Sequence, residues 1–507
     1  MHARQQPGNQ NLKPPPNILL ILADSLRADA LGCYGNPHGV TPHIDALAER
    51  GLRFDTCYST SPLCVPARSQ LLSGKLCHET GNIKNQAWRY HTDRPTEVDG
   101  VFLDPEVPTL PTLLGDRGYT TAHLGKNHFH PRDRSYGFDV MEQCDFYGRD
   151  LFEKDDYYLF LKAKGYAHLH KDGFGRMDVV GTGGAGAIRD EFGLVDRLCP
   201  YVSELPAELQ TTPWLGGRAR AFLKDQTNEK PFFAVTSFYA PHDPYCVSRP
   251  FDTQFDWKDM KLRPLPAALQ PSALHVGEQS LRAEVSDEIW KKNIAHYLAN
   301  VFLIDREVGA LVDTLKEQDL YENTLILLTS DHGDTLGEHR IWGKNLMYEC
   351  CARVPLIVHH GGGGTAQGVT RETATLLDLF PTLLKQAGAE PNDDRLAGGI
   401  LNLQSASDSP DDRVVIGELG NSEFPQYFVR KGPWKLIYLD GYPAWELYNL
   451  DEDPGELDNL SDSEPEVREN LFEELQQWLI AEAPHTRPAA QGVDQVNMSE
   501  LCRQSSL

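Results

Sequence analysis

The chain has 507 residues, of which 40% are hydrophobic and 24% are charged, a composition typical of a soluble globular protein large enough for two domains. Its 48 basic and 73 acidic residues give a net charge of −25, which argues against nucleic acid or an anionic membrane as a partner but not against an anionic substrate. No apolar run approaches the length of a membrane span, so we expect no membrane partner.

The cysteines and the first residues bear on the compartment. The ten cysteines include no Cys-x-x-Cys pair, and for this length they are not dense enough to indicate a disulfide framework. Residues 1–16 lack the apolar core of a secretory signal. The sequence therefore predicts a cytoplasmic protein, or a periplasmic or secreted one if a leader precedes this sequence.

The first predicted strand is a continuous apolar run at 17–23 (NILLILA), typical of a strand buried on both faces of a parallel sheet. Asp24 follows it directly. Ligands of open α/β sheets bind at the carboxyl edge of the strands, so Asp24 is a candidate site residue, although a turn or helix N-cap is the plainer interpretation of a single aspartate. Residues 41–51 then have a helical repeat that ends in glycine.

The stretch 61–74 (SPLCVPARSQLLSG) predicts a second helix. Pro66 suits the first turn of a helix, and residues 67–72 continue it. Cys64 then lies at a helix N-terminus, where free backbone N–H groups and the macrodipole favour an anion. Arg68 follows four residues later on the same helix face, so it can point back at Cys64.

Three further predicted strands are each followed within a few residues by charged or titratable side chains. These are Lys126 and His128 after the strand at 119–124, His242 after the strand at 232–238, and Asp331 and His332 after the strand at 324–329. Lys344 comes next, in the segment 339–344 (HRIWGK). Each alone is most simply a loop residue, but together with Asp24 and Cys64 they predict one site at the carboxyl edge of a sheet.

The rest of the large domain mixes regular and irregular sequence. We predict helices at 110–118, 214–225, 286–319 and 373–388, and a strand at 354–360. Residues 141–213 and 245–285 have no regular periodicity. We interpret the first as an insertion that covers the substrate, and its aromatic side chains suit either stacking on a sugar ring or a local core.

The sequence pattern changes after an Asp- and Ser-rich linker at 402–412. Short alternating strands at 414–419, 427–432 and 434–439 precede a helix at 464–482. The sequence therefore predicts an α/β catalytic domain (1–400) with a large, mostly parallel sheet flanked by helices. A small α+β domain (401–507) with a polar tail follows it.

The run Cys64-Val65-Pro66-Ala67-Arg68 resembles the Cys-x-Pro-x-Arg signature of type I sulfatases, in the alkaline phosphatase superfamily. NILLILAD, GKNH, PFFAVTSFYAPH, SDHG, WGK and LYNLDEDPGE also resemble family segments, in the same chain order. The resemblance implies an alkaline-phosphatase-like fold. It also implies a sulfuric ester hydrolase that releases inorganic sulfate from an aryl or carbohydrate sulfate monoester.

Formylglycine, an aldehyde made from the signature cysteine, is the nucleophile in that family. The resemblance implies that a formylglycine-generating enzyme acts on Cys64. One hydroxyl of the hydrated aldehyde attacks sulfur, and the other expels the sulfate. The family also implies one divalent cation, Ca²⁺ first and Mn²⁺ or Mg²⁺ as alternatives, with four ligands: Asp24, the modified Cys64, Asp331 and His332.

The resemblance assigns roles to the remaining site residues as well. Lys126, Lys344 and His242 would bind the sulfate oxygens. Arg68 would hold a hydroxyl of the formylglycine hydrate, and His128 would deprotonate that hydrate. The proton for the leaving alkoxide would come from His242 or Lys344.

Two departures from the family pattern keep other functions open. Many relatives have a second aspartate where Ser25 follows Asp24, and an asparagine where His332 follows Asp331. Fewer carboxylates and one imidazole suit Ca²⁺ less well and admit Mn²⁺. Both departures also occur in relatives that hydrolyse phosphonate monoesters and phosphodiesters, which is the first alternative. The second is a non-catalytic relative that binds sulfated glycans with Cys64 unmodified.

Overall fold

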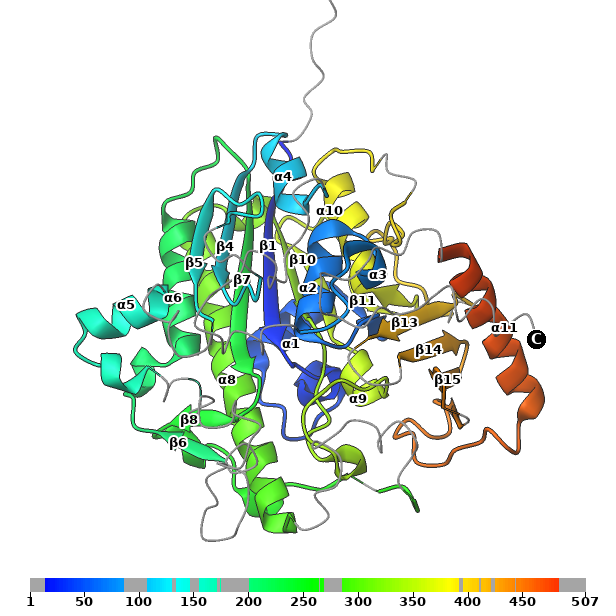
Figure 1. Cartoon of the computed structure of the whole chain (residues 1–507). Coiled ribbons are helices and arrows are strands. Elements are labelled where there is room, and N and C mark those ends of the chain that lie inside the picture. Colours follow the sequence, from blue (N-terminus) through cyan, green and yellow to red (C-terminus); the bar gives the residue numbers. More distant parts are fainter. Residues whose placement is uncertain are drawn as a thin grey trace, which may run out of the picture.

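The computed structural model describes residues 14–85, 107–129, 134–145, 155–170, 174, 200–263, 265–268, 285–391, 395–409, 412–420, 425–442 and 444–482. A large sheet lies at the centre with helices on both sides, and a smaller sheet lies beside it (Figure 1). Among the helices of these residues, none has both the length and the apolar character needed to cross a bilayer.

The large sheet has eight strands in the order β11-β2-β10-β9-β1-β7-β4-β5. Their bounds are β1 Asn17–Asp24, β2 Leu52–Phe54, β4 Thr120–Gly125, β5 Val140–Gln143, β7 Phe232–Pro241, β9 Thr324–Ser330, β10 Leu356–His360 and β11 Gly368–Thr370. Strands β9, β1, β7, β4 and β5 are parallel, whereas β10 runs antiparallel to both of its neighbours. The predicted large, mostly parallel sheet is confirmed.

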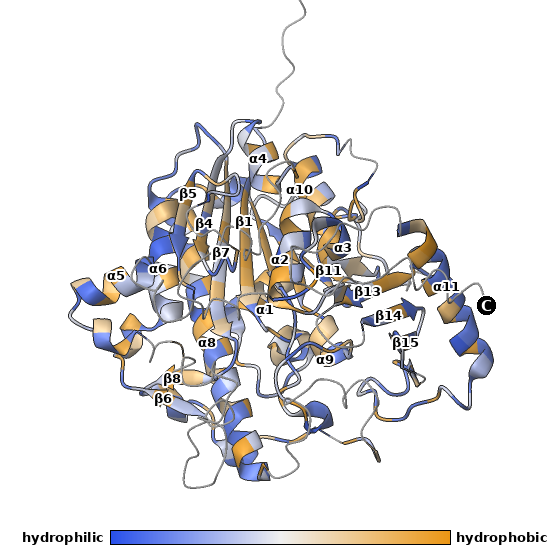
Figure 2. Cartoon of the chain, viewed as in Figure 1, coloured by the Kyte–Doolittle hydropathy of each residue, from blue (hydrophilic) through white to orange (hydrophobic). Residues whose placement is uncertain are grey.

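The three central strands, β1, β7 and β9, are buried along their whole length, and Figure 2 shows β1 as apolar. Alternate residues of β1 face opposite cores, as the two-residue period of a strand requires. Leu19 and Ile21 belong to one core, and Ile18 and Leu20 to the other. Because β1, β4, β7 and β9 are parallel, their carboxyl ends meet at one edge of the sheet.

Helices cover both faces of the sheet. One core contains side chains of α1 Pro42–Arg50, α6 Thr211–Lys224 and the long α8 Asp287–Glu317. The other contains side chains of α2 Cys64–Ser73, α4 Leu110–Gly115 and α10 Leu379–Gln386. The α2 helix therefore packs beside the central strands (Figure 1), and its first residue, Cys64, lies 3.9 Å from Asp24 at the end of β1.

The C-terminal part forms a four-stranded antiparallel sheet of β13 Val415–Leu419, β14 Gln426–Lys431, β15 Trp434–Leu439 and β16 Trp445–Asn449. One face packs on α11 Pro465–Glu482 through Leu471, Leu475 and Leu479. The other face packs on residues of the large domain that include Tyr58, Leu63 and Tyr348. This agrees with the predicted α+β addition, while the boundary at residue 401 stays a prediction.

The region expected to be irregular, 141–213, contains regular structure in its described parts. It contains α5 Asp156–Ala163 and β6 Tyr201–Ser203, which pairs with β8 Cys246–Ser248. These elements are too short to produce a clear periodicity in the sequence. Tyr157 is fully buried and belongs to the core. Residues 146–154, 171–173 and 175–199 of the expected covering insertion lie outside the described residues.

The expected helix at 373–388 is three elements. Strand β12 Ala374–Thr375 pairs with β3 Cys57–Tyr58, a short 3-10 helix covers Leu376–Asp378, and α10 begins at Leu379. The carboxylate of Asp378 accepts the backbone N–H of Thr375, which fixes the change of direction between them. The apolar spacing of the segment continues through this turn, so periodicity alone predicted one helix.

Candidate active site

All nine residues that the sequence singled out lie together at the carboxyl edge of the large sheet. Asp24 ends β1, and the others follow the neighbouring strands or begin α2. They are Asp24, Cys64, Arg68, Lys126, His128, His242, Asp331, His332 and Lys344. Six are buried, and His128, His242 and Lys344 are partly buried, with the His242 and Lys344 side chains 9% and 11% exposed.

The α2 helix begins at Cys64, as predicted, and Gly74 ends it in the left-handed conformation. Leu63 precedes the helix and provides no side-chain cap. The N–H of Val65 is instead satisfied by Asn85, whose Oδ1 lies 2.9 Å away. Because residue 64 is the first of the helix, its side chain lies at the positive end of the macrodipole.

Four side chains form a cluster suited to a cation: Asp24, Cys64, Asp331 and His332. One donor atom from each lies within 4.8 Å of all the others. The Cys64 Sγ is 3.2 Å from His332 Nε2 and 3.9 Å from Asp24 Oδ1. His332 Nδ1 is 2.7 Å from the carbonyl of Gly333, so the Nδ1–H donates there and the Nε2 lone pair faces the cluster. Two carboxylates and an imidazole on buried, oriented side chains fit a divalent cation.

Arg68 hydrogen-bonds the carboxylates of both Asp24 and Asp331. Its Nε donates to Asp331 Oδ2 at 2.8 Å, and its Nη2 donates to Asp24 Oδ2 at 3.0 Å. Its Nη1 donates to the Lys126 carbonyl and to Ser237 Oγ, at 2.7 and 2.8 Å. Among the described residues no hydrogen bond joins Arg68 to Cys64, so the expectation that it points back at the cysteine is replaced by this contact with the carboxylates.

Three basic side chains approach Asp24 from other elements. Lys126 Nζ is 2.6 Å from Asp24 Oδ2. Lys344 Nζ and His242 Nε2 are each 3.9 Å from Asp24 Oδ1, and they contact each other. The Lys126 ammonium also lies 4.9 Å from the centre of the Tyr239 ring, a cation–π distance. Three convergent N–H donors in a buried site can bind a tetrahedral oxyanion.

Burial and neighbouring charges strongly shift the pKa values of the side chains in the site. Burial by itself would raise the pKa of Asp24, but Lys126, His242 and Lys344 hold it well below its usual range. Burial would also raise the pKa of Cys64, and Lys126, Lys344 and His332 hold it well below that of a free thiol. Burial and the charge of Asp24 raise the pKa of Asp331. Against the effect of burial, Asp331 and Cys64 raise the pKa of His332 to about 9. The site therefore brings anionic ligand atoms together beside the ammonium groups of Lys126 and Lys344.

His128 occupies a strained backbone position, and sequence reasoning missed the residue that stabilises it. The φ of His128 is +64°, in the left-handed region that non-glycine residues rarely adopt. Asp145 Oδ2 accepts the N–H groups of Asn127 and His128 at 3.1 and 3.2 Å. The His128 side chain then hydrogen-bonds Cys64. Burial and Lys126 lower the pKa of His128, which favours the neutral imidazole that a base requires.

Ser237 is a second residue that the sequence reasoning missed. Its Oγ accepts from Arg68 and donates to the Lys126 carbonyl at 2.7 Å, so it joins α2 to the end of β4. It lies within the buried strand β7, where a serine in an apolar run gives only a weak signal. Asp145 gave no signal either, because it follows the short β5 in a stretch without periodicity.

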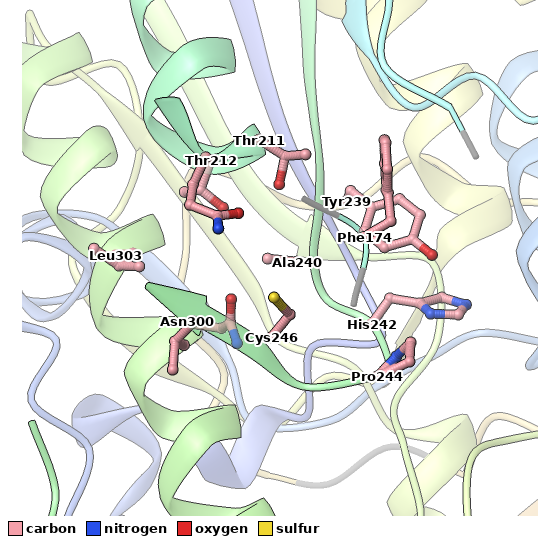
Figure 3. Close-up of a pocket in the computed structure, with 12 residues that line it drawn as sticks. Phe174, Thr211, Thr212, Tyr239, Ala240, His242, Pro244, Cys246, Asn300 and Leu303 are labelled. Carbon is pink, nitrogen blue, oxygen red and sulfur yellow. The ribbon is translucent and has the colours of Figure 1, made fainter. Parts of the chain in front are cut away.

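Asp243 orients the imidazole of His242, which also borders a pocket. Its Nδ1 contacts the carbonyl of Asp243 and lies 3.2 Å from the carboxylate of the same residue, so Nε2 faces Lys344. The pocket lies between the end of β7, the start of α6, β8 and α8 (Figure 3). Apart from His242 its walls are neutral, including Tyr239, Thr211, Thr212 and Asn300.

Comparison with known proteins places this geometry in a family. The sulfatase family model matches residues 16–389, and the model of the N-sulphoglucosamine sulphohydrolase C-terminal region matches residues 337–482. Together these matches cover the large domain and the C-terminal sheet with α11.

Individual relatives agree with that assignment. A choline-sulfatase of Rhizobium meliloti is 29% identical over 457 residues, which are 88% of this chain and 83% of the relative. An N-acetylglucosamine-6-O-sulfatase of Bacteroides thetaiotaomicron is 26% identical over 494 residues, 88% of this chain and 82% of that protein. The crystal structure of a phosphonate monoester hydrolase of Agrobacterium radiobacter has the same fold. Its TM-score is 0.73 at 22% identity, over 93% of this chain and 96% of that one. The chain thus belongs to the sulfatase family of the alkaline phosphatase superfamily and is a sulfate ester hydrolase.

Proposed function

We propose that this sulfatase acts through formylglycine made from Cys64 by a formylglycine-generating enzyme. The observation that supports this most directly is the position of Cys64. It is the first residue of α2, lies 3.2 Å from His332 Nε2 and 3.8 Å from Lys126 Nζ, and hydrogen-bonds His128. When hydrated, the aldehyde supplies two hydroxyls, one as the nucleophile for sulfur and one whose deprotonation releases sulfate.

We propose that Asp24, Asp331, His332 and the converted residue 64 hold one divalent cation. The donor set fits because its four atoms already lie within 4.8 Å of one another. The ion would neutralise sulfate oxygens and lower the pKa of the formylglycine hydroxyl. The family implies Ca²⁺, and the imidazole of His332 makes Mn²⁺ its main competitor, ahead of Mg²⁺. Elemental analysis of active protein should find one divalent ion per chain, and Asp331→Ala should lose both metal and activity.

The other side chains of the site bind the anion and move protons. Lys126, Lys344 and His242 bind the sulfate oxygens that the cation leaves free. Arg68 holds Asp24 and Asp331 in place and stays near the formylglycine hydroxyl. His128 is the base for the hydrate, because its imidazole is neutral and in contact with residue 64.

The His242–Lys344 pair supplies the leaving-group proton. His242 directs Nδ1 to Asp243, and its Nε2 contacts Lys344 Nζ. Against the effect of burial, Cys64 and Asp24 raise the pKa of Lys344 in the unconverted chain, and Asp24 and Asp243 remain after conversion to keep the proton on Lys344. Replacing Lys344 should slow the hydrolysis of aliphatic sulfates, whose leaving alkoxides need a proton, far more than the hydrolysis of aryl sulfates with good leaving groups.

For the substrate we propose a small-molecule or glycan sulfate monoester. The choline-sulfatase and N-acetylglucosamine-6-O-sulfatase relatives support this range of alcohols. Assays with sulfate monoesters of an aryl alcohol, a sugar and choline, at matched concentrations, rank these alternatives.

The phosphonate monoester hydrolase reading is the second candidate. It is favoured by the fold shared with such an enzyme and by Ser25 and His332, the two departures at the cation site. Steady-state kinetics with one aryl leaving group on sulfate, phosphonate and phosphodiester decide between the two. We expect the highest kcat/KM for the sulfate ester, and a preference for either phosphorus substrate would reassign the enzyme.

Mass spectrometry of the peptide with residue 64 tests the nucleophile and the binding-protein alternative together. We expect the aldehyde in protein made in a host that contains the modifying enzyme. Fully active protein with only alkylatable cysteine at this position would overturn the mechanism. Protein that keeps an unmodified Cys64 in this host and hydrolyses no sulfate ester would favour the glycan-binding relative, whereas the aldehyde would exclude it.

A further inference from the structure

The encoded residue 64 and its converted form offer a metal different atoms. Before conversion the cluster presents one sulfur from Cys64, one nitrogen from His332, and oxygens from Asp24 and Asp331. We propose that the unconverted chain is a zinc protein, in which these four side chains bind Zn²⁺ tightly and keep Cys64 unreactive. The preference for zinc weakens when residue 64 offers oxygen instead of sulfur. This inference rests on the ligand set proposed above, and it does not require the chain to be catalytically active.

The distances between the donor atoms match a tetrahedral zinc site. With Zn–S of about 2.3 Å and Zn–N or Zn–O of about 2.0 Å, tetrahedral geometry puts sulfur about 3.5 Å from each lighter atom and nitrogen about 3.3 Å from oxygen. Here Sγ lies 3.2 Å from His332 Nε2 and 3.9 Å from Asp24 Oδ1. His332 Nε2 lies 3.8 Å from both Asp24 Oδ1 and Asp331 Oδ1. These four separations are within about 0.6 Å of the tetrahedral values, and the separations of Asp331 from Cys64 and from Asp24 are within 4.8 Å.

The side chains are already oriented as ligands. His332 donates its Nδ1–H to the Gly333 carbonyl, which leaves Nε2 as the acceptor that a metal needs. Ser25 fixes both carboxylates, since its Oγ donates to Asp24 Oδ1 and its N–H donates to Asp331 Oδ1, each at 3.2 Å. All four ligands are fully buried, so water competes weakly for the ion.

Cations of the protein lie beside the complex. A thiolate and two carboxylates contribute three negative charges, and Zn²⁺ leaves one of them uncompensated. Lys126 Nζ lies 3.8 Å from the sulfur, and Arg68 bridges the two carboxylates, so these two cations more than neutralise the remaining charge inside the protein. A family site with asparagine in place of His332 would lack the nitrogen that, beside a thiolate, makes zinc preferred over Ca²⁺ and Mg²⁺.

The test uses the full chain made in a host without the modifying enzyme, with intact Cys64 verified by mass spectrometry. Co²⁺ serves as the spectroscopic probe, since a thiolate ligand gives a near-ultraviolet charge-transfer band and tetrahedral coordination gives intense visible bands. We expect one equivalent of Co²⁺ to produce both, and one equivalent of Zn²⁺ to abolish them. Competition with a chelating dye then measures the affinity for Zn²⁺.

Variants separate this site from other thiols. Cys64→Ser should lose the charge-transfer band and bind Zn²⁺ about 100-fold more weakly or worse, because a hydroxyl is a poor zinc ligand. The control is the double change Cys350→Ser with Cys351→Ser, whose sulfurs lie 3.9 Å apart and could bind cobalt themselves. That variant should keep the band.

A second measurement needs no variant. Zn²⁺ should slow alkylation of Cys64 by iodoacetamide at least about tenfold while leaving the partly exposed Cys33 unchanged. Absence of the charge-transfer band from the unconverted chain, or its persistence in Cys64→Ser, would overturn the zinc proposal. If the converted enzyme hydrolyses sulfate esters but the cysteine form does not bind Zn²⁺, this inference alone would be refuted. If the cysteine form binds Zn²⁺ but the converted form hydrolyses no ester, only the proposed function would be refuted.

Discussion

Asp24 remains ionised although no part of it is exposed. Burial opposes its charge, and the basic side chains that reverse the effect come from three different segments of the chain, with Lys126, His242 and Lys344 each within 3.9 Å. Removing one partner of such a buried group leaves the others unbalanced, which is costly. The same side chains that hold Asp24 charged are those proposed to bind sulfate, so the site is built as an anion pocket.

Replacing Cys64 should abolish turnover without unfolding the protein. We expect kcat to fall about 10⁴-fold or more in Cys64→Ala and in Cys64→Ser, because neither side chain can form the hydrated aldehyde. Initial rates on an aryl sulfate, with circular dichroism as the check on folding, measure this. Cys33→Ser, at a partly exposed position outside the site, is the matched control and should stay active. A serine variant with a near-normal rate would place the nucleophile elsewhere.

At the scale of elements, the short β5 and α5 position a residue of the site. Asp155 caps α5 by accepting from Tyr158, and its other oxygen accepts the N–H of Asp145 at 2.9 Å. Asp145 in turn accepts the N–H groups of Asn127 and His128. Two N–H groups on one carboxylate oxygen stabilise the positive φ of His128, a conformation that costs about 1 kcal/mol or more.

Asp145 should therefore act as a positioning residue for His128. Asp145→Ala is expected to lower kcat about 100-fold with little change in KM, because the base moves while the sulfate-binding cations stay. Asp145→Asn keeps an oxygen that can accept both N–H groups, and it should recover most of the rate.

The control for this series is Asp139→Ala. Asp139 accepts the N–H of Thr121 near the opposite end of the same strand, β4, away from the site. Its removal should leave kcat unchanged. An asparagine variant as slow as the alanine variant would show that the carboxylate charge matters, rather than its hydrogen bonds.

Considered as a whole molecule, the C-terminal sheet supports the segment that leads into Cys64. The Glu418 N–H donates to the Thr60 carbonyl and its own carbonyl accepts from Ser61 Oγ, both at 2.8 Å. The Glu418 carboxylate accepts the N–H groups of Cys77 and His78, at the start of the short helix after α2. The small domain is thus part of the framework of the site.

His78 should make this contact between the two parts of the molecule depend on pH. Burial disfavours its charge, but Glu418 and Glu482 raise its pKa to about 10. The folded pKa exceeds the unfolded value of about 6.5, so the stabilisation is complete below pH 6.5 and is lost as pH rises through 10. The loss over this window should amount to several kcal/mol.

Urea unfolding between pH 6 and pH 10 checks this prediction. In His78→Gln the slope of the unfolding free energy over this window should be reduced, and the variant should be less stable than wild type at pH 6. His168→Gln, at an exposed histidine, is the control and should follow wild type. Equal slopes in wild type and His78→Gln would show that the histidine is neutral in the folded protein.

Much of this architecture could be predicted from the sequence because it depends on local patterns. The apolar runs at 17–23, 232–238 and 324–329 predicted buried parallel strands, and β1, β7 and β9 confirm them. The polar residue that follows each run placed the site at the carboxyl edge. The Pro66 helix and the position of Cys64 at its start also followed from residues close together in the chain.

Tertiary structure alone decided the interactions that join distant segments. Arg68 shares a helix face with Cys64, yet its hydrogen bonds go to Asp331 and Asp24, 263 and 44 residues away. Asp145 supports His128 from a short strand with no detectable period, and Glu418 reaches Thr60 from another sheet. Helix and strand periodicity report which face of an element is buried, but the partner of a buried charge depends on which elements pack together. The sequence by itself thus predicted the sheet edge and the residues of the site, and folding determined the hydrogen bonds and charges that make them one site.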